Sequence, residues 1–485
     1  MKIAIGFIVL IISSSLMGED IPISVAPEDQ VAPSVAFSGN NYLVVWEDRQ
    51  EGYGINGQLV SEEGTLIGDN FYISTGGRFP LVEWGDMNYL VTWRRYGRLV
   101  SEDGTPIGEE FRIFPDDNDT LCFTYSIGDI AWNGENYFVL MPGTIIAPSS
   151  RYCLFARFIS SNGTVGDSLI FVAGGDSLSV PLFPRVASDG KDFLVVWEKG
   201  IRQGHHQIWG RCVSDAGTVL DTCFQISSYP PFEWMMSPDI AWGGENYLVI
   251  WNDGRGGGGY EWDIYGQLVS REGILVGEEI PICTAPGGDI QFPRVASNGM
   301  NYLAVWFDSR TPPPWEIYGQ FVSFDGIPTD TNFMVSEDPP SDSAGQWEPD
   351  ICGGGGRYFI VWSEQGWQPP DSSFDIYGNF IPFTGIETDN TLPLSDIYLF
   401  QNKPNPFKNI KNTEVSYFLP RNSEVTFTIF NLEGQVVFRT NLGHKSAGFH
   451  TLAIDGNKLG SQGVYFYRIE ADGYAITKKM VMMGR

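Results

Sequence analysis

The residues best suited to chemistry in this sequence are carboxylates that follow recurring tryptophans. Asp48, Asp253 and Asp308 each lie two positions after a Trp and have an Arg within the next two residues, and Glu364 follows Trp362 at the same distance. Paired carboxylates can act as general acid and as base or nucleophile in glycosidic bond cleavage. A motif that is copied along the chain also suits a structural role, because an ion pair can tie a turn to its neighbour. We favour the structural role and keep glycoside cleavage as the alternative.

Aromatic side chains are concentrated in the long segments between these motifs. Exposed Trp rings can stack on sugar rings or anchor a protein partner. They can equally fold over their own loops as local hydrophobic plugs. The candidate ligand-binding residues, taken from the loops and from the Asp–Arg motifs together, are Trp234, Trp262, Asp253, Arg255, Asp308, Arg310, Trp315, Trp347 and Trp367.

The sequence gives no reason to expect a cofactor or a metal site. Residues 116–119 are rich in Asp but lack the ordered spacing of a calcium-binding loop, and only four His are present. There is no C-x-x-C pair, no nucleophile-elbow motif, no phosphate-cradling loop and no dinucleotide fingerprint. A binding protein is therefore expected more than an enzyme.

The N-terminus has the layout of a cleaved secretory signal peptide. Lys2 is followed by an apolar run over residues 3–12 and by small residues, and charge returns at Glu19 and Asp20. The apolar run is too short to span a bilayer comfortably, and no later segment is apolar for long enough to form a transmembrane helix. We therefore expect residues 1–18 to be removed on export.

Export also bears on the six cysteines, since disulfides persist outside the cytoplasm. Cys212 and Cys223 flank a hairpin centred near Gly217, and facing strand positions would place their side chains within bridging range. These two are the candidate disulfide. Cys283 and Cys352 occupy strand positions that elsewhere hold Ser or Ala, so buried thiols are expected there.

Net charge excludes one class of partner. The chain has 30 Lys and Arg against 59 Asp and Glu, which gives a formal net charge of −29 at pH 7. A chain this acidic is repelled by phosphate backbones, so nucleic acid is not expected as a partner.

One line of sequence recurs along most of the chain and predicts the fold. Each unit holds four short runs rich in Val, Ile, Leu and aromatic residues, separated by Gly, Asn, Asp or Pro, which predicts four antiparallel strands. Seven such units, with a period of about 50 residues, predict an all-β fold, a seven-bladed β-propeller of four-stranded blades over residues 19–391. The marker position of the repeat, spaced by 47 to 56 residues, is occupied in turn by Trp46, Trp93, Met141, Trp197, Trp251, Trp306 and Trp362.

Loop lengths separate two faces of the predicted propeller. The short turns between strands one and two and between strands three and four share one face, because alternate connections lie on the same side. The other face carries long, variable connections, where binding usually resides. Ring closure has two candidate outer strands, residues 21–24 and residues 392–395. We favour the N-terminal one, since a strand that joins the two ends of the ring resists opening.

The C-terminal region differs from the repeats in charge and in pattern. Residues 392–485 contain 11 Lys and Arg and 7 Asp and Glu, against 19 and 52 in the rest of the chain. Such a shift marks a second domain. Alternating apolar runs predict a small β-sandwich of immunoglobulin-like type over residues 409–485, preceded by a linker and domain start at residues 392–408.

Several motifs of residues 396–485 resemble the type A C-terminal sorting domains of the type IX (Por) secretion system. The segment Q-N-K-P-N-P-F at 401–407 is similar to the opening of that family, and the strand–turn at 429–435 and the run G-V-Y-F-Y-R at 463–468 follow in the family's order. Ile454 stands where the family often has Trp. The residues that match the sorting motifs are Asn402, Pro404, Asn405, Pro406, Phe407, Gly434, Gly463, Tyr465, Lys478 and Lys479.

This resemblance implies a destination and a partner. A protein with such a domain is exported by the Sec pathway, folds in the periplasm and is carried across the outer membrane by the type IX secretion machinery. It is then released or attached to the cell surface of a Gram-negative-type bacterium.

The repeats resemble secreted bacterial propeller repeats, most clearly at residues 251–273. Those repeats carry no settled activity, so this likeness concerns the fold alone. The favoured function is a secreted or cell-surface propeller that binds a glycan or protein ligand through its variable face. The alternative is an extracellular glycan-cleaving hydrolase with acidic residues at the mouth of the propeller channel.

Overall fold

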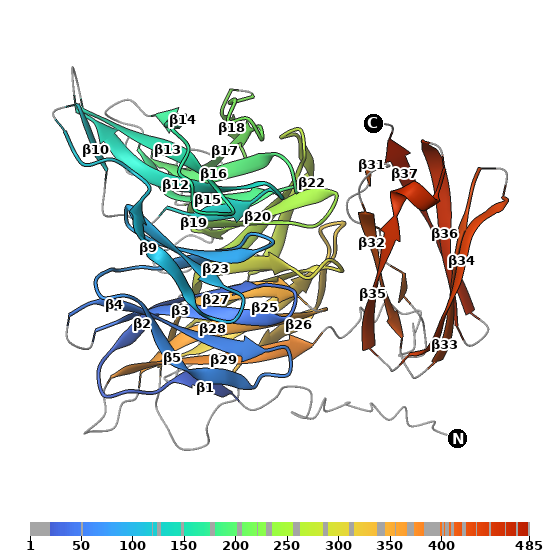
Figure 1. Cartoon of the computed structure of the whole chain (residues 1–485). Coiled ribbons are helices and arrows are strands. Elements are labelled where there is room, and N and C mark those ends of the chain that lie inside the picture. The colour runs from blue at the N-terminus through green and yellow to red at the C-terminus, as the bar shows by residue number, and fades with distance from the viewer. Residues whose placement is uncertain are drawn as a thin grey trace, which may run out of the picture. The chain divides into compact units, whose positions relative to one another are not determined.

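The chain divides into two compact units, residues 1–383 and residues 384–485, whereas the sequence placed this division between residues 391 and 392. Most strands of both units are labelled in Figure 1. The predicted signal peptide lies outside the residues that this computed structural model describes. The described residues are 20–49, 52–118, 120–123, 128–146, 150–174, 180–200, 206–220, 222–228, 235–255, 262–284, 290–309, 315–336, 345–354, 356–365, 373–382, 398–399, 402, 407–408, 412–419, 423–432, 434–445, 448–460, 462–471 and 474–483.

The described part of the first unit consists of seven antiparallel sheets (Figure 1). Sheets 1 to 3 follow one another along the chain. Their strands are β2 (Gln30–Phe37), β3 (Asn41–Asp48), β4 (Gly54–Ser61) and β5 (Leu66–Ser74) in sheet 1; β6 (Leu81–Trp84), β7 (Asn88–Trp93), β8 (Tyr96–Ser101) and β9 (Pro106–Arg112) in sheet 2; and β10 (Leu121–Phe123), β11 (Ile130–Trp132), β12 (Asn136–Ile145), β13 (Arg151–Ser160) and β14 (Ile170–Gly174) in sheet 3.

Sheets 4 to 7 repeat the arrangement, with one strand supplied from the N-terminus. Their strands are β15 (Pro181–Ser188), β16 (Phe193–Gly200), β17 (His206–Val213) and β18 (Phe224–Gln225) in sheet 4; β19 (Met235–Trp242), β20 (Asn246–Asp253), β21 (Asp263–Ser270) and β22 (Leu275–Cys283) in sheet 5; β23 (Ile290–Ser297), β24 (Tyr302–Asp308), β25 (Glu316–Val322) and β26 (Pro328–Met334) in sheet 6; and β27 (Gly345–Gly354), β28 (Arg357–Gln365), β29 (Phe374–Pro382) and β1 (Ile21–Ser24) in sheet 7.

The first strands of the sheets form a closed cycle of contacts. They contact one another in the order β2, β6, β11, β15, β19, β23, β27 and back to β2. β1 pairs antiparallel with β29, with Ile21 opposite Gly378, so the N-terminal strand completes the last sheet. The predicted closure by residues 21–24 is therefore confirmed, and the arrangement is that of a β-propeller-like all-β fold.

The second strand of each sheet is buried on both faces, because each sheet is packed between two neighbours. In β3, the run from Tyr42 to Trp46 has no exposed surface. Each hydrophobic core of the first unit combines residues from adjacent sheets; one of them joins Val45 and Ile55 of sheet 1 to Val91 of sheet 2. Stability of one sheet therefore depends on its neighbours.

Hydrogen bonds from tyrosines join successive sheets. The Tyr89 hydroxyl of sheet 2 donates to the Asn41 carbonyl of sheet 1 at 2.7 Å, and the Tyr302 hydroxyl of sheet 6 donates to the Asn246 carbonyl of sheet 5 at 2.7 Å. Tyr137 makes the equivalent bond from sheet 3. The repeated Tyr thus fills the core and satisfies a backbone acceptor of the preceding sheet.

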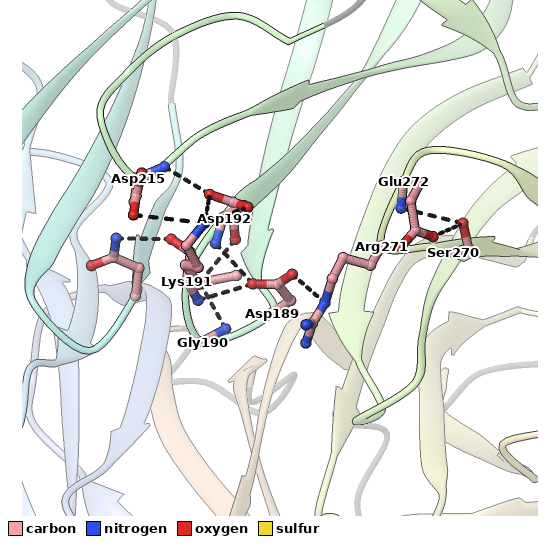
Figure 2. A network of polar contacts seen from close by, with 10 residues as sticks. Asp189, Gly190, Lys191, Asp192, Asp215, Ser270, Arg271 and Glu272 are labelled. Carbon is pink, nitrogen blue, oxygen red and sulfur yellow. Dashed lines mark hydrogen bonds and ion pairs between the residues drawn. The ribbon is translucent and has the colours of Figure 1, made fainter. Parts of the chain in front are cut away.

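The uniform turns meet on one face, as the sequence predicted. Figure 2 shows Asp189, in the hairpin between β15 and β16, with Arg271, in the turn between β21 and β22 of the next sheet. The Arg271 Nε lies 2.6 Å from the Asp189 carboxylate, whose other oxygen accepts the Lys191 and Asp192 backbone N–H groups at 2.9 and 2.8 Å. Glu102 of sheet 2 likewise connects a turn to the neighbouring sheet, because its carboxylate accepts a hydrogen bond from the Asn40 side chain of sheet 1 at 2.7 Å.

A strained residue recurs near the start of the inner strands. Each of these non-glycine residues has a positive φ of 45° to 55° and stands directly before a Pro. In five of the six sheets the strand register shifts there, which is the pattern of a β-bulge that re-aims the strand end. The residues are Ala32, Phe79, Phe183, Ser237, Phe292 and Glu348.

The second unit has two sheets around one core. One sheet has the order β30 (Tyr398–Leu399), β32 (Asn412–Leu419) and β35 (Gly448–Asp455). The other has the order β31 (Phe407–Lys408), β37 (Tyr474–Met483), β36 (Gly463–Ala471), β33 (Ser423–Phe430) and β34 (Val436–Lys445), and a 3₁₀ turn, η2 (Gly456–Lys458), follows β35. Val415 and Tyr417 of the first sheet pack against Phe427, Tyr467 and Met480 of the second.

Candidate functional site

The Asp–Arg motif of sheet 5 is an internal clamp. The Asp253 side chain is fully buried and accepts hydrogen bonds from Trp251 Nε1 at 2.8 Å and from Arg255 Nε and Nη2 at 2.7 and 2.6 Å. Arg255 also pairs with Glu279 at 2.7 Å and lies over the Tyr265 ring. These bonds hold the end of β20 to β21 and β22, which is the structural role that the copied motif indicated.

The other predicted binding residues are spread over several sheets. Asp308 is buried and accepts from Trp306 Nε1 at 3.2 Å, which repeats the bond of Asp253. Trp262 is half-buried and directly precedes β21. Trp234, Arg310 and Trp367 lie outside the described residues.

Trp315 and Trp347 belong to one aromatic cluster. Their rings meet edge to face at 5.1 Å, and Phe307 stacks on Trp347 with ring centroids 4.6 Å apart. The cluster joins sheets 6 and 7, and both Trp residues are half-buried. This mutual stacking agrees with the interpretation of the loop aromatics as local plugs, while contact with a ligand stays a prediction.

Charged side chains of alternating sign occupy equivalent positions in the inner strands. Asp129 accepts the Val186 N–H of the next sheet at 2.8 Å, and Asp239 accepts the Val295 N–H in the same way at 2.7 Å. Arg185 lies 3.3 Å from Asp239. The seven equivalent positions, each following the bulge region, are Ser34, Leu81, Asp129, Arg185, Asp239, Arg294 and Asp350.

Burial shifts the pKa values of these charged side chains of the inner strands. It raises the pKa of Asp129 to about 6, against the opposing effect of the Arg185 charge. It raises the pKa of Asp239 and of Asp350 as well, and it lowers the pKa of Arg294. The inner strands thus hold carboxyl groups that keep protons more readily than exposed ones do.

Glu83 introduces a carboxyl group where most inner strands have Ala. Its side chain stands at the position of Ala36 and Ala131, and burial together with the negative charge of Asp129 raises its pKa to about 8. Cys352 occupies the same position in sheet 7, and burial raises the pKa of its thiol. Glu83 therefore keeps its proton to a higher pH than an exposed glutamate does.

A small pocket opens between sheets 2 and 3. It lies on the face opposite the uniform turns, because Arg94 belongs to the connection between the second and third strands of sheet 2. Its lining residues are Arg78, Phe79, Leu81, Thr92, Trp93, Arg94, Gly128, Asp129, Val139, Leu140 and Met141.

Three lining positions depart from the repeat. Met141 stands where every other sheet has Trp. Gly128 stands where the inner strands of the other sheets have Pro, and Leu81 stands where those strands have a polar or charged residue. A Cβ on Gly128 would lie 1.7 Å from the Leu140 carbonyl oxygen, so the backbone approach at this wall requires Gly. The pocket is therefore the place where the repeat is broken.

Two arginines border this pocket. Arg78 is held by Glu47 of sheet 1, whose buried Oε1 lies 3.3 Å from Nε, and its guanidinium lies over the Tyr53 ring at 4.6 Å. Arg94 is exposed and has a φ of 50° in the two-residue connection between β7 and β8. The candidate site combines these cations with the Asp129 carboxyl group and with the apolar walls formed by Phe79 and Trp93.

Sequence reasoning did not select these residues as a site. The repeat comparison had singled out Met141 as the one position without Trp, and that departure was the available signal. Arg78, Arg94 and Asp129 are far apart in sequence and belong to no motif, so only the fold brings them together.

The predicted Cys212–Cys223 disulfide is not formed, because all six cysteines are free thiols. Val213 pairs with Val219 across the turn, and the Leu220 N–H donates to the Cys212 carbonyl at 3.1 Å, so Leu220 takes the place opposite Cys212. Cys212 packs in the core between sheets 4 and 5, whereas Cys223 packs against the core between sheets 3 and 4. The two thiols therefore face different cores.

No group of three or more His, Cys, Asp and Glu side chains in the described residues is arranged to hold a metal ion. Within the same residues, no helix has the length and hydropathy that a membrane crossing requires.

The described residues of the tail motif are mainly structural. Asn402 is buried, its N–H donates to the Tyr467 hydroxyl at 2.9 Å and its side chain donates to Thr413 at 2.9 Å. Phe407 and Tyr465 are buried in the single core.

The remaining described tail positions are Gly434 in a turn, Gly463 at the start of β36, and two lysines on the last strand. Gly434 and Gly463 have positive φ values of 77° and 157°. On β37, Lys478 is half-buried and Lys479 is exposed. Pro404, Asn405 and Pro406 lie outside the described residues.

Comparison with known proteins assigns the tail. Residues 403–483 match the family described as the secretion system C-terminal sorting domain. This domain implies interaction with the type IX secretion machinery and export to the cell surface or the extracellular space. No curated protein matches the chain.

Solved structures that are similar to this chain have low sequence identity to it. An α-L-arabinanase of Penicillium chrysogenum in complex with arabinobiose is 12% identical, with a TM-score of 0.41, over 76% of this chain and 99% of that chain. An α-L-arabinofuranosidase of Fusarium graminearum in complex with an iminosugar inhibitor is 12% identical, with a TM-score of 0.41, over 77% and 100%. A Trypanosoma rangeli sialidase is 8% identical, with a TM-score of 0.39, over 96% and 87%.

Proposed function

We propose that the first unit is a seven-bladed β-propeller, that the second is an immunoglobulin-like sorting domain, and that the exported propeller binds an extracellular glycan. The pocket between sheets 2 and 3 carries this proposal. Sheets whose only role is to build the propeller can have the same residues at equivalent positions. A single ligand site needs residues that differ from the repeat. The three departures Leu81, Gly128 and Met141 coincide at such a place.

The lining of the pocket suits a sugar. The residues that line it include the charged Arg78, Arg94 and Asp129 and the apolar Phe79 and Trp93. Sugars present hydroxyl groups at their edges and C–H groups on their faces, so a few placed polar groups beside aromatic surface are the usual means of recognition. The half-buried Trp262, Trp315 and Trp347 are proposed as further contacts for a longer glycan or a protein ligand on the same face.

A glycan array with the full mature chain tests binding, and a pocket-filling variant then tests the location. Met141→Trp restores the residue that is fully buried at this position in sheets 1, 5, 6 and 7. It should fill the pocket and reduce affinity at least tenfold. Met87→Trp is the matched control, because Met87 is 67% exposed in a uniform turn on the opposite face. Absence of binding to any glycan, or equal affinity of both variants and wild type, would reject the proposal.

Cleavage of the bound glycan is the second candidate, and one observation favours it. A general acid must hold its proton at working pH, and Glu83 and Asp129 have pKa values raised to about 8 and about 6. The assay is release of reducing sugar from polysaccharides, compared between wild type, Glu83→Gln and Asp129→Asn. Turnover that both variants abolish supports an enzyme, and undetectable turnover in wild type rejects it.

A further inference from the structure

We infer that Phe183 and Phe292 form a docking surface for a basic polypeptide, whose arginine side chains lie over the two phenyl rings. Phe183 is near the start of β15 and Phe292 near the start of β23, and β19 lies between these inner strands. Because the inner strands end in the uniform hairpins, their starts lie on the face of the long, variable connections. The inference concerns other residues than the glycan pocket and does not depend on it.

The backbone at these two positions does not require phenylalanine. The equivalent residues of sheets 1, 5 and 7 are Ala32, Ser237 and Glu348, with φ values of 50° to 52°, against 45° for Phe183 and 54° for Phe292. A positive φ is unfavourable for a bulky side chain. The bulge explains the backbone conformation, but it gives no reason for an aromatic ring there.

Both rings are accessible to a partner. Phe183 is 50% exposed and Phe292 is 37% exposed. Within the described residues, neither ring stacks on another aromatic ring or lies beneath a cation, whereas Trp315 and Trp347 pack against each other. Exposed apolar side chains that are not explained by packing are typical of interaction surfaces.

The equivalent residue of sheet 2 indicates what kind of group these rings bind. The guanidinium carbon of Arg78 lies over the Phe79 ring, 5.1 Å from its centroid. A cation in this position is attracted by the negative face of the ring. In sheets 4 and 6 the residue at the position of Arg78 is Leu182 or Gln291, so the preceding residue supplies no cation there. A guanidinium group of a partner can take the equivalent place.

The charge of the first unit favours a cationic partner. Residues 1–391 contain 19 Lys and Arg against 52 Asp and Glu, so the unit attracts polycations and accelerates their encounter. The two arginines of the same inner strands are offset by carboxyl groups. Arg185 lies 3.3 Å from Asp239. Burial and the Arg185 charge lower the pKa of Arg294, and the charges of Asp239 and Asp350 oppose this shift.

The spacing of the two rings favours a polypeptide that carries more than one arginine. Sheets packed face to face lie about 10 Å apart, so residues two sheets apart are separated by at most about 20 Å. An extended chain advances about 3.3 Å per residue, so arginines up to about six residues apart can reach both rings. The planar guanidinium of arginine also stacks on aromatic rings better than the ammonium group of lysine does.

The test measures binding of labelled peptides to the full mature chain by fluorescence anisotropy. The first probe is a Gly–Ser peptide with two arginines about five residues apart, and the second has citrulline in place of both arginines. We expect at least tenfold tighter binding of the arginine peptide. Phe183→Leu and Phe292→Leu should each weaken it about threefold, as the loss of one exposed cation–π contact does, whereas Phe183→Tyr and Phe292→Tyr should keep the affinity.

Phe171→Leu is the matched control, because this ring is 47% exposed but lies on the outer strand β14. Its affinity for the arginine peptide should equal that of wild type. The net charge is the same in all these variants, so a difference between them reports on the rings alone. Thermal unfolding within about 2 °C of wild type shows that the fold is kept. Phe183→Ala and Phe292→Ala, which introduce the residue of sheet 1, replace a Leu variant that unfolds earlier.

Three results would overturn the inference. Equal binding of the arginine and citrulline peptides, or binding of neither, would reject a cationic partner. Unchanged affinity in both Leu variants would show that net charge alone attracts the peptide and would reject the rings as a docking surface. Tighter binding of a glucosamine oligosaccharide than of the arginine peptide, weakened by the same variants, would assign the rings to an amino sugar and reject the polypeptide.

Discussion

Arg78 of sheet 2 reaches the buried carboxylate of Glu47 in sheet 1, with Nε 3.3 Å from Oε1. The same carboxylate binds Arg49 Nε at 3.0 Å and accepts the Phe79 backbone N–H at 3.3 Å. One side chain therefore joins two sheets and orients a residue of the candidate pocket. Glu47 therefore contributes both to the contact between sheets 1 and 2 and to the position of Arg78 at the pocket.

Glu47→Gln should weaken this joint. It removes the charge that holds two arginines while it keeps the shape of the side chain, so we expect a loss of about 1–2 kcal/mol, since both arginines are partly exposed. All 15 Trp lie before residue 383, so Trp fluorescence during urea unfolding reports on the first unit. Glu109→Gln, at an exposed position of β9, is the control. The same unfolding free energy in both variants would contradict the assigned role of Glu47.

Removing one inter-sheet tyrosine hydroxyl should destabilise the first unit modestly. Tyr89→Phe and Tyr302→Phe each remove a 2.7 Å bond to a backbone carbonyl of the preceding sheet, at a cost of about 1 kcal/mol each. The two bonds share no residue, so the double variant should lose the sum of the two. Tyr72→Phe, at a ring that is 64% exposed, should change the thermal midpoint little. A double variant as stable as wild type would show that these bonds carry no net stability.

Glu83 should make the first unit less stable as the pH rises from about 5 to about 8. Its pKa is about 8 in the folded chain, whereas an unfolded Glu titrates near about 4.3. Between these values the folded state binds the extra proton, so raising the pH favours unfolding, by up to about 1.4 kcal/mol per pH unit.

The Glu83 contribution can be isolated by substitution. Glu83→Gln should flatten the dependence of unfolding free energy on pH and should exceed wild type in stability above pH 8, whereas Glu109→Gln should keep the wild-type slope. The comparison requires urea unfolding between pH 5 and pH 9. Parallel curves for wild type and Glu83→Gln would mean that Glu83 is ionised in the folded chain.

Deletion of residues 392–485 should trap the first unit in the periplasm of a host that has type IX secretion. The deleted segment contains the sorting-domain match at residues 403–483. The measurement is immunoblotting of periplasmic, cell-surface and medium fractions. Leu432→Ala, which changes an exposed side chain in the same domain, should be exported as wild type is. Equal amounts of the deleted and intact chains outside the cell would contradict the role of the tail.

The repeat in the sequence was sufficient to predict most of the fold. A period-two pattern with small turn residues predicts strands, and an apolar second strand predicts burial between neighbours, as β3 and β24 show. Likeness to the outer strands left two candidates for the closing strand, and residues 21–24 were preferred because a strand that joins the two ends of the ring resists opening. The copied Asp253–Arg255 motif was favoured as structural, and in the structure the two side chains are joined by an ion pair.

The pocket and the cysteine positions could not be predicted in the same way. The pocket depends on Arg78, Arg94 and Asp129 being brought together from two sheets, and on the small volume of Met141. No local sequence pattern indicates that residues from two different sheets will meet at one place. The Cys212–Cys223 prediction assumed a regular hairpin, but Val213 pairs with Val219 and Gly210 pairs with Phe224, so extra residues bulge between these pairs and shift the register.

Hydrogen–deuterium exchange of the full mature chain, with and without the tightest glycan of the array, tests the central claim most directly. The account predicts that the glycan slows exchange at residues 78–81, 92–94 and 139–141, which come from sheets 2 and 3 and meet at the pocket. Slowed exchange confined to residues 315 and 345–347, or no slowing anywhere in the first unit, would contradict it.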